Sequence, residues 1–395
     1  MDLYILLFYL FVVAKTFYFS SKKESLYLFS PVLVIDITYI LYVLVPYLSL
    51  YSVLDIGESF HKIVFYSTIV NLCFHFLLRP FNYEKIKIDC AFNISYELYW
   101  KKIIKVSLSI ILFTGLLTGV TKGLLTGENI EGLRRTSEIG IGFLREIPML
   151  AVLLGLFYIL LISSAKEKMK LKYVLLIACL LFVSIGNKSV ILKVIVVYIS
   201  YLTIKHRGFR LYEYLVYYMA IPFSAALLDA FRQNNFNSIG DSINKYLMYG
   251  TFIFQVNTVK IVEKIEKTEF LNGKEFYSGF YKIIPRFLWK DKPLSFDYYY
   301  KELIGYEFEG GGTPMPLIYR FYTNFGNSFC IYYIIWMCFL FYCYRKFYNT
   351  KSSSSILFLM FFFLNYCSPD SLFGYVELYF LLLLLLYFVF KKRML

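Results

Sequence analysis

Arginine is the first residue type in this sequence that could carry chemistry, because several arginines stand close to the ends of long apolar stretches. A guanidinium is always charged and can bind phosphate through two parallel hydrogen bonds, so arginine is well suited to hold a phosphate-bearing ligand. Each arginine has an alternative role, as a solvated loop residue or as a side chain that reaches lipid headgroups. The arginines concerned are Arg134, Arg135, Arg145, Arg232, Arg286 and Arg320.

Acidic residues near the same positions, and one histidine, are candidates to accept a proton. Glu377 lies a few residues inside the last apolar stretch, where a charge is costly and is usually paired. Asp229 stands three residues before Arg232, so an i,i+3 ion pair is the alternative to a catalytic role for it. The further candidates are Glu138, Glu146, Asp291 and His61.

The composition indicates which kind of protein must position these residues. Of 395 residues, 59% are hydrophobic and only 17% are charged, and the mean hydropathy is +0.59. A water-soluble globule cannot bury this much apolar surface, which excludes soluble enzymes, nucleic-acid-binding domains and disordered proteins. The net charge of +14 is explained by lysine and arginine in the loops on one side of a membrane. The seven cysteines form no CxxC pair, so neither a disulfide framework nor a zinc site is predicted.

The fold class that we predict is an all-α, polytopic bundle of about eleven transmembrane helices, since a span needs about 20 apolar residues. Asp36 and Lys193 fall within spans and are expected to face the bundle interior. The predicted spans are 3–20, 27–50, 61–79, 103–121, 146–165, 171–186, 189–204, 211–228, 326–344, 355–369 and 373–390.

The distribution of lysine and arginine predicts the orientation. Alternate loops are basic, so the positive-inside rule places the N-terminus outside and the C-terminus in the cytoplasm of a bacterial plasma membrane. The first stretch has no basic region before it and is interpreted as a retained span. The chain then divides into helices 1–8 (residues 1–228), a large extracytoplasmic segment (229–325), and helices 9–11 with a cytoplasmic tail (326–395).

The outer segment 229–325 is nearly neutral, with twelve basic and eleven acidic residues. Apolar residues at helical spacing predict an amphipathic helix over about 241–268, which would lie on the membrane surface or over the mouth of the bundle. The sequence IPRFLWKDKP follows at 284–293, and the run GGGTPMP at 310–316 is expected to be a loop. The next residues, YRFYTNFG at 319–326, lead back into the membrane.

These last segments resemble the O-antigen polymerase (Wzy-type) family of oligosaccharide repeat-unit polymerases. The segment IPRFLWKDKP carries the matching residues Pro285, Arg286, Trp289, Lys292 and Pro293. A third segment, SIGNKS at 184–189, resembles a turn of the family, with Lys188 in place of the usual arginine. The expected architecture is also similar to that of GT-C-type transferases of lipid-linked glycans. The residues of 310–326 that match the family's next motif, called the second motif below, are Thr313, Pro314, Pro316, Tyr319, Asn324, Phe325 and Gly326.

The resemblance implies a metal-independent glycosyltransferase that polymerises undecaprenyl-pyrophosphate-linked oligosaccharides of O antigen or capsule at the outer leaflet. The lipid pyrophosphate is the leaving group and already carries the activation energy, so no cofactor is expected. Besides these lipid-linked glycans, the implied partners are membrane lipids and a chain-length regulator protein, with no nucleic acid. The implied pyrophosphate-binding residues are Arg232, Arg286, Arg320, Arg135, Arg145 and Lys188, and the implied candidates for the catalytic base are Asp229, Glu138 and Glu377.

Two alternatives have a similar architecture. A flippase or other transporter of lipid-linked oligosaccharides would also be polytopic, although such proteins usually contain helix repeats with short loops. An O-antigen ligase-like transferase would attach the glycan to a different acceptor. The absence of an Asp-x-Asp and of a Walker A sequence argues against sugar-nucleotide and ATP-dependent enzymes.

Overall fold

The computed structural model describes residues 3–22, 35–36, 39–51, 57–77, 251–282, 288–289, 291, 293, 296–305 and 315–350. These ranges form helices and contain no strand, which confirms the all-α prediction for them. Among them, Glu58–Leu77 is the helix whose length and composition would suffice to cross a membrane. The predicted spans from 103 to 228 and from 355 to 390 lie outside the described residues.

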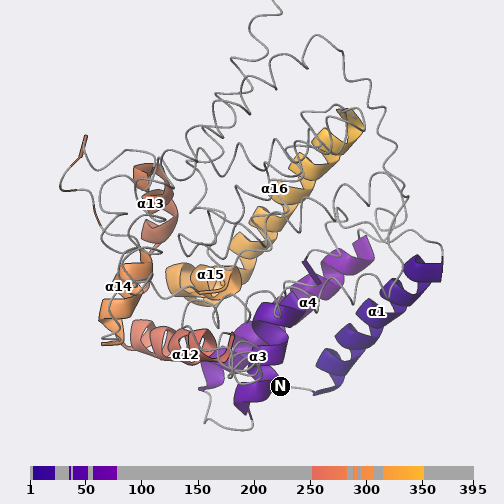
Figure 1. Cartoon of the computed structure of the whole chain (residues 1–395), viewed down its shortest axis with the longest axis horizontal. Helices are drawn as coiled ribbons and strands as arrows, with labels where there is room; N and C mark the ends of the chain where they lie inside the picture. Colours follow the sequence, from indigo (N-terminus) through magenta and orange to yellow (C-terminus); the bar gives the residue numbers. More distant parts are fainter. Residues whose placement is uncertain are drawn as a thin grey trace, which may run out of the picture.

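Three long helices form the frame of the described structure: α1 (Leu3–Lys22), α4 (Glu58–Leu77) and α16 (Phe329–Thr350). They cover most of the stretches predicted as the first, third and ninth spans. Figure 1 shows them running in roughly the same direction, and α4 packs against both α1 and α16. Much of α4 is therefore buried, with Ile63 and Val64 near its start and Ser67 at its centre fully enclosed.

Within the stretch predicted as the second span, a change in helix type precedes a proline. Residues Ile40–Leu44 form a wide π-helical turn, and α3 (Val45–Tyr51) continues from it. Pro46 has no backbone N–H and its ring crowds the carbonyl one turn earlier, so a regular α-helix cannot pass through this point unchanged. A π-helical turn is one way to accommodate this break.

The described part of the segment 229–325, which was predicted to lie outside the membrane and is called the outer segment for that reason, consists of shorter helices at one end of the long ones (Figure 1). They are α12 (Thr251–Lys267), α13 (Lys274–Lys282) and α14 (Phe296–Leu303). The predicted amphipathic helix is confirmed from residue 251 onward: Val259, Val262 and Ile265 are buried on one face, and α12 packs against α3 and α4. Residues 241–250 lie outside the described residues.

A helix that the sequence analysis did not predict, α15 (Leu317–Phe325), precedes α16. Pro316 stands immediately before it, which suits a residue with a fixed φ and no N–H. Gly326 ends it with φ +55°, a conformation that favours glycine, and a Cβ there would lie 3.0 Å from the Phe270 ring. The chain then continues through a single 3₁₀ turn, Gly326–Ser328, into α16.

Candidate functional site

Of the predicted phosphate-binding and catalytic residues, Arg320 is the one that the described ranges contain. It lies on α15 and is 3% exposed. Among the other candidates for the base, Asp291 is exposed and His61 is half-buried, with its Nδ1 2.8 Å from the Tyr47 hydroxyl. The remaining predicted site residues lie outside the described residues: Asp229, Glu138, Glu146, Glu377, Arg232, Arg286, Arg135, Arg145 and Lys188.

Helical spacing on α15 places three polar side chains on the face that contacts α13 and α14. Arg320, Thr323 and Asn324 stand at positions i, i+3 and i+4, so they share one face of the helix. The Thr323 hydroxyl donates to the Arg320 carbonyl at 3.1 Å, and Asn324 Nδ2 donates to the same carbonyl at 2.8 Å. These local bonds hold the two smaller side chains close to α15 and fix the direction in which Asn324 reaches.

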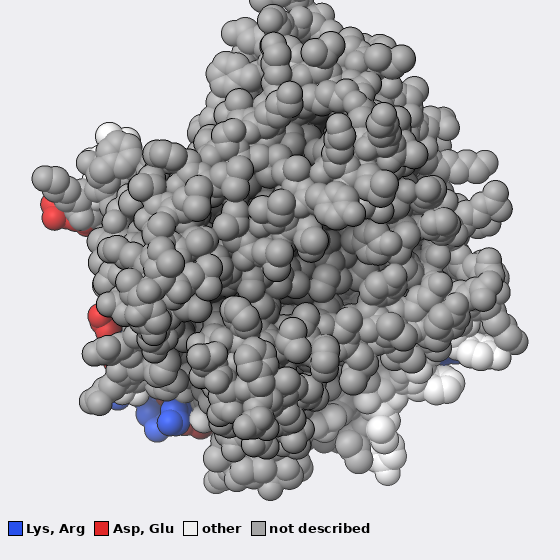
Figure 2. All heavy atoms as spheres, viewed as in Figure 1, with Lys and Arg blue, Asp and Glu red and all other residues white. Residues whose placement is uncertain are grey.

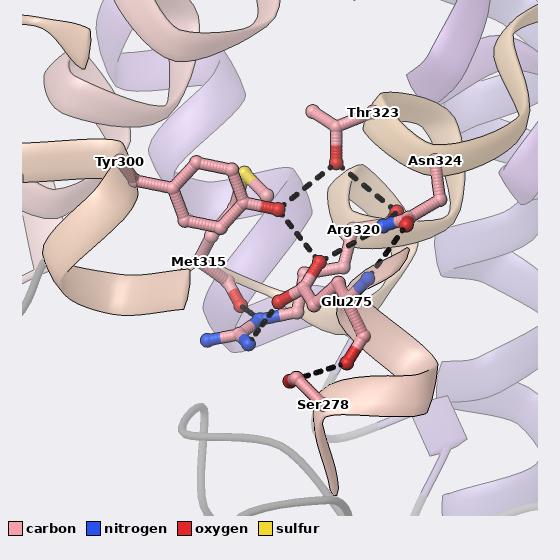
Figure 3. Close-up of polar contacts among 7 residues, drawn as sticks. All are labelled: Glu275, Ser278, Tyr300, Met315, Arg320, Thr323 and Asn324. Atoms are coloured by element: carbon pink, nitrogen blue, oxygen red, sulfur yellow. Dashed lines mark hydrogen bonds and ion pairs between the residues drawn. The ribbon is translucent and has the colours of Figure 1, made fainter. Parts of the chain in front are cut away.

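The common partner of Arg320 and Asn324 is Glu275, which lies in the first turn of α13, where a negative charge is favoured by the helix dipole. Its Oε1 forms an ion pair with an Arg320 guanidinium nitrogen. Its Oε2 accepts from the Tyr300 hydroxyl at 2.6 Å and from Asn324 Nδ2 at 2.9 Å. Figure 3 shows this carboxylate at the centre of side chains from α13, α14 and α15.

The Tyr300 and Thr323 hydroxyls lie 3.3 Å apart, and three further contacts involve backbone atoms. Arg320 Nε donates to the Met315 carbonyl at 2.9 Å, which ties the guanidinium to the residues before α15. The Glu275 backbone N–H donates to Asn324 Oδ1 at 3.4 Å, and Ser278 Oγ donates to the Glu275 carbonyl at 2.6 Å. The seven residues drawn in Figure 3, Glu275, Ser278, Tyr300, Met315, Arg320, Thr323 and Asn324, are called the Glu275–Arg320 network below.

Burial determines the electrostatics of this network. The ion-paired side chains of Arg320 and Glu275 are 4% and 5% exposed, so each charge depends on the other for stabilisation. Burial, with the Glu275 carboxylate beside it, raises the pKa of Tyr300 well above its usual value. The Tyr300 hydroxyl therefore stays protonated and remains a donor to Glu275.

The geometry assigns a structural role to Glu275. Both of its carboxylate oxygens accept hydrogen bonds from buried side chains, so these oxygens are engaged within the protein and do not face a substrate. The charge of Arg320 is compensated by Glu275, so an anion that approached it would have to compete with a buried carboxylate. What the network does is join α13, α14 and α15 into one unit.

Sequence reasoning missed this site because it treated Arg320 alone and counted Glu275 only as one of the acidic residues of the segment. A signal was present: Arg320, Thr323 and Asn324 have the spacing of one helix face within LIYRFYTNF. Their partner is 45 residues earlier in the chain, a pairing that no periodicity predicts.

The described ranges contain no group of three or more His, Cys, Asp or Glu side chains that could hold a metal ion. Comparisons of the chain with protein-family models, with curated protein sequences and with solved structures give no match. The resemblance noted in the sequence therefore remains a hypothesis about function.

Proposed function

We propose that this protein is a polytopic membrane glycosyltransferase that polymerises undecaprenyl-pyrophosphate-linked oligosaccharide units at the outer leaflet. The hydroxyl oxygen of an incoming unit bonds to the anomeric carbon of the growing glycan while the bond from that carbon to the lipid pyrophosphate breaks. A protein base takes the hydroxyl proton, and cationic side chains stabilise the negative charge on the departing pyrophosphate. The pyrophosphate supplies the driving force, so the proposal requires no cofactor.

The observation that carries this proposal is the attachment of the motif-bearing segment to one end of the long apolar helices. Tyr319 of the second motif is fully buried and stacks on Phe60, near the start of α4, with ring centroids 4.7 Å apart. Asn324 of the same motif donates a hydrogen bond to Glu275. Gly326 of this motif ends α15. The motif residues thus attach a polar segment to the helix ends, as an enzyme acting at a membrane surface requires.

The surface of the described residues supports a membrane location for the long helices. Charged side chains visible in Figure 2 gather on the left, over the short outer helices, whereas the described surface over α1 at lower right is mostly uncharged. Large apolar side chains are exposed on α1, α4 and α16, where contact with lipid would cover them. They include Leu7, Phe8, Phe11, Phe76, Leu77, Ile331, Ile335 and Phe339.

The roles that we propose rest on charge and, for Arg320, also on burial. Arg232 and Arg286, supported by Arg135, Arg145 and Lys188, would bind the pyrophosphate, and Asp229, Glu138 or Glu377 would act as the base. Arg320 would have a positioning role. Its ion pair with Glu275 would hold α13 and α14 in place, the helices that precede and follow Arg286 in the sequence. Arg286 stands in the sequence between α13 and α14, the two helices that the network joins to α15.

The test uses the full-length protein in lipid nanodiscs, supplied with lipid-linked repeat units from a strain that lacks this protein. We expect longer glycans and one undecaprenyl pyrophosphate released per bond formed. Arg286→Ala should lower the elongation rate about 100-fold or more, the typical effect of removing one donor to a developing charge. Arg207→Ala, in a predicted cytoplasmic loop, is the matched control and should leave the rate unchanged.

Three results would contradict the proposal. Translocation of the lipid-linked units without elongation would indicate a flippase. Transfer to another acceptor, with repeat units left unjoined, would indicate a ligase. Well-folded protein that neither elongates nor releases the lipid pyrophosphate would remove the basis for any transferase reaction.

A further inference from the structure

A second buried acid–base pair lies among α1, the helical residues 35–36 and α4, and the proposed glycan chemistry does not use it. Asp36 and His75 are each 2% exposed, and His75 Nδ1 lies 3.1 Å from Asp36 Oδ2. The Tyr9 hydroxyl donates to the other Asp36 oxygen at 2.7 Å. An ionisable pair within apolar helices is costly to bury, which points to a function rather than to stability.

The Thr16 hydroxyl determines where the protons of this pair can lie. Thr16 Oγ1 is 2.9 Å from the Val12 carbonyl and 2.7 Å from His75 Nε2. A hydroxyl has one proton, so it can donate to only one of these two atoms at a time. When it donates to Val12, His75 Nε2 must carry a proton and donate it to Thr16.

In that arrangement one proton also lies between His75 Nδ1 and Asp36 Oδ2. The pair is then neutral overall, either as carboxylate with imidazolium or as carboxylic acid with imidazole. Loss of one proton leaves the Asp36 carboxylate, with the remaining imidazole proton on Nδ1, donated to Asp36. His75 Nε2 then becomes an acceptor, and the Thr16 hydroxyl rotates away from Val12 to donate to it.

Every donor and acceptor of Asp36 and His75 is satisfied in both arrangements, and no heavy atom has to move. The Val12 carbonyl gives up a side-chain donor when Thr16 rotates, but a carbonyl at that place in a helix keeps its backbone partner. The cluster can therefore gain and lose one proton at the cost of a single hydroxyl rotation. A pair built only to hold helices together does not need this property.

Polar groups line the same face of α4 over most of its length. His61, Thr68, Asn71 and His75 follow one another at intervals of three, four or seven residues, over about 21 Å of helix. The Tyr39 hydroxyl lies 2.7 Å from Ser67 Oγ and 2.8 Å from Thr68 Oγ1. This polar face connects the Asp36–His75 region with the end of α4 where the outer segment packs.

We propose that Asp36, His75, Thr16 and Tyr9 form a proton-binding site that alternates between a neutral and a singly negative state by rotation of the Thr16 hydroxyl. The ligand is a proton, and the site goes beyond the proposed transferase function. Among the described residues, the titratable groups near it are Tyr9 on α1, Tyr39, and Tyr333 on α16, which bonds to Asn71 one turn from His75. Lys15 and Cys73 are close in sequence but are exposed.

The test is an NMR titration of the full-length protein in nanodiscs with ¹⁵N-labelled histidine side chains. The protein has three histidines, so removing His61 and His206 in turn assigns the His75 signals. We expect His75 to change from a proton on Nε2 to an unprotonated, accepting Nε2 in a single one-proton step between about pH 4 and 10, a window spanning the ordinary His and carboxyl values. If His75 keeps Nε2 in one state over this whole range in the wild-type protein, the proposal is wrong.

Two variants sharpen the measurement. Asp36→Asn removes the carboxylate, so the one-proton step of His75 should disappear. Asp291→Asn, at an exposed position, is the matched control and should leave this step intact. If Asp36→Asn does not fold, Thr16→Val retains the shape of the side chain without its hydroxyl. It should shift the midpoint by about one pH unit, the equivalent of one hydrogen bond. An unchanged midpoint in Thr16→Val, or a wild-type step in folded Asp36→Asn, would overturn the assignment.

Discussion

The Glu275–Arg320 network and the Asp36–His75 pair are both buried acid–base clusters, but they differ in which protons can move. Arg320 is always protonated, and Glu275 accepts from Arg320, Tyr300 and Asn324 at once. In our proposal, the Asp36–His75 pair releases a proton and the Thr16 hydroxyl rotates to compensate for the loss. A cluster of fixed donors holds helices together, whereas a cluster with one reversible donor can bind a proton.

The largest effect is expected from breaking the fixed pair. Arg320→Ala leaves the Glu275 carboxylate buried without its counter-charge, which should lower the free energy of unfolding by about 3–5 kcal/mol. Denaturant-induced unfolding in mixed micelles measures it. The exposed pair of Glu58 and Lys62, 2.8 Å apart, supplies the matched control, and Lys62→Ala should cause no measurable loss.

A double variant tests whether the charge or the shape of the network matters more. Combining Arg320→Met with Glu275→Gln removes both charges together and should recover part of the stability that Arg320→Ala loses. If Arg320→Ala unfolds no more easily than Lys62→Ala, the network does not hold the outer helices together.

The second prediction compares the tyrosine that donates to each carboxylate. Tyr300→Phe and Tyr9→Phe each remove one hydrogen bond to an acidic group and should each cost about 1.5–3 kcal/mol, as bonds to charged groups do. The cost of Tyr300→Phe should be constant from pH 5 to 9, because the raised pKa of Tyr300 keeps its hydroxyl a donor and Arg320 stays charged throughout. The cost of Tyr9→Phe should vary with pH, because in our proposal the net charge of the Asp36–His75 pair varies.

Unfolding free energies of these two variants at several pH values check this prediction. Equal pH profiles for both variants would remove the distinction between a fixed and a reversible cluster.

Local sequence patterns predicted the helices but not the pairs. The spacing of Val259, Val262 and Ile265 identified the buried face of α12, because a helix repeats every 3.6 residues. Asp36 was correctly expected to face the interior, since a carboxylate in an apolar stretch avoids lipid. Its partner His75 stands 39 residues away, and Glu275 stands 45 residues from Arg320, separations that depend on tertiary packing.

The helix α15 was missed for a different reason. A glycine–proline run precedes it and Gly326 follows it, so the region was interpreted as a loop leading back into the membrane. Only nine residues separate these helix-breaking signals, and a helix this short depends on its buried face for stability. Glu275 and α4 are among the partners that cover this face of α15. The sequence alone does not indicate that they lie beside α15.

The third prediction concerns Gly326 and separates the strain of its backbone conformation from the steric contact of an added side chain with Phe270. Gly326→Ala should cost roughly 1–3 kcal/mol because alanine tolerates this φ poorly, and the added Cβ would also crowd Phe270. Gly305→Ala is the matched control, since Gly305 has φ +62° but nothing within 4 Å of its added Cβ. The difference between the two variants measures the contact with Phe270.

Gly326→Ala also tests how independent the two clusters are. It should weaken the outer helices and leave the His75 titration unchanged, because α15 does not contact Asp36 or His75 through any hydrogen bond among the described residues. A shifted His75 midpoint in this variant would mean that the two regions act as one.

The smallest effect is expected from Tyr322, whose hydroxyl donates to Glu266. Burial, with the Glu266 hydrogen bond, raises the pKa of Tyr322 from 10 to about 12. Its contribution to stability is therefore complete below pH 10 and is lost between pH 10 and 12, where the unfolded chain ionises first. Tyr322→Phe should lose stability less steeply than the wild type over that interval, and the unfolding temperatures of both proteins from pH 8 to 12 measure it. Equal slopes would mean that the Tyr322 hydroxyl is as accessible in the folded protein as in the unfolded chain, and that the outer helices are packed less tightly than the Glu275–Arg320 network requires.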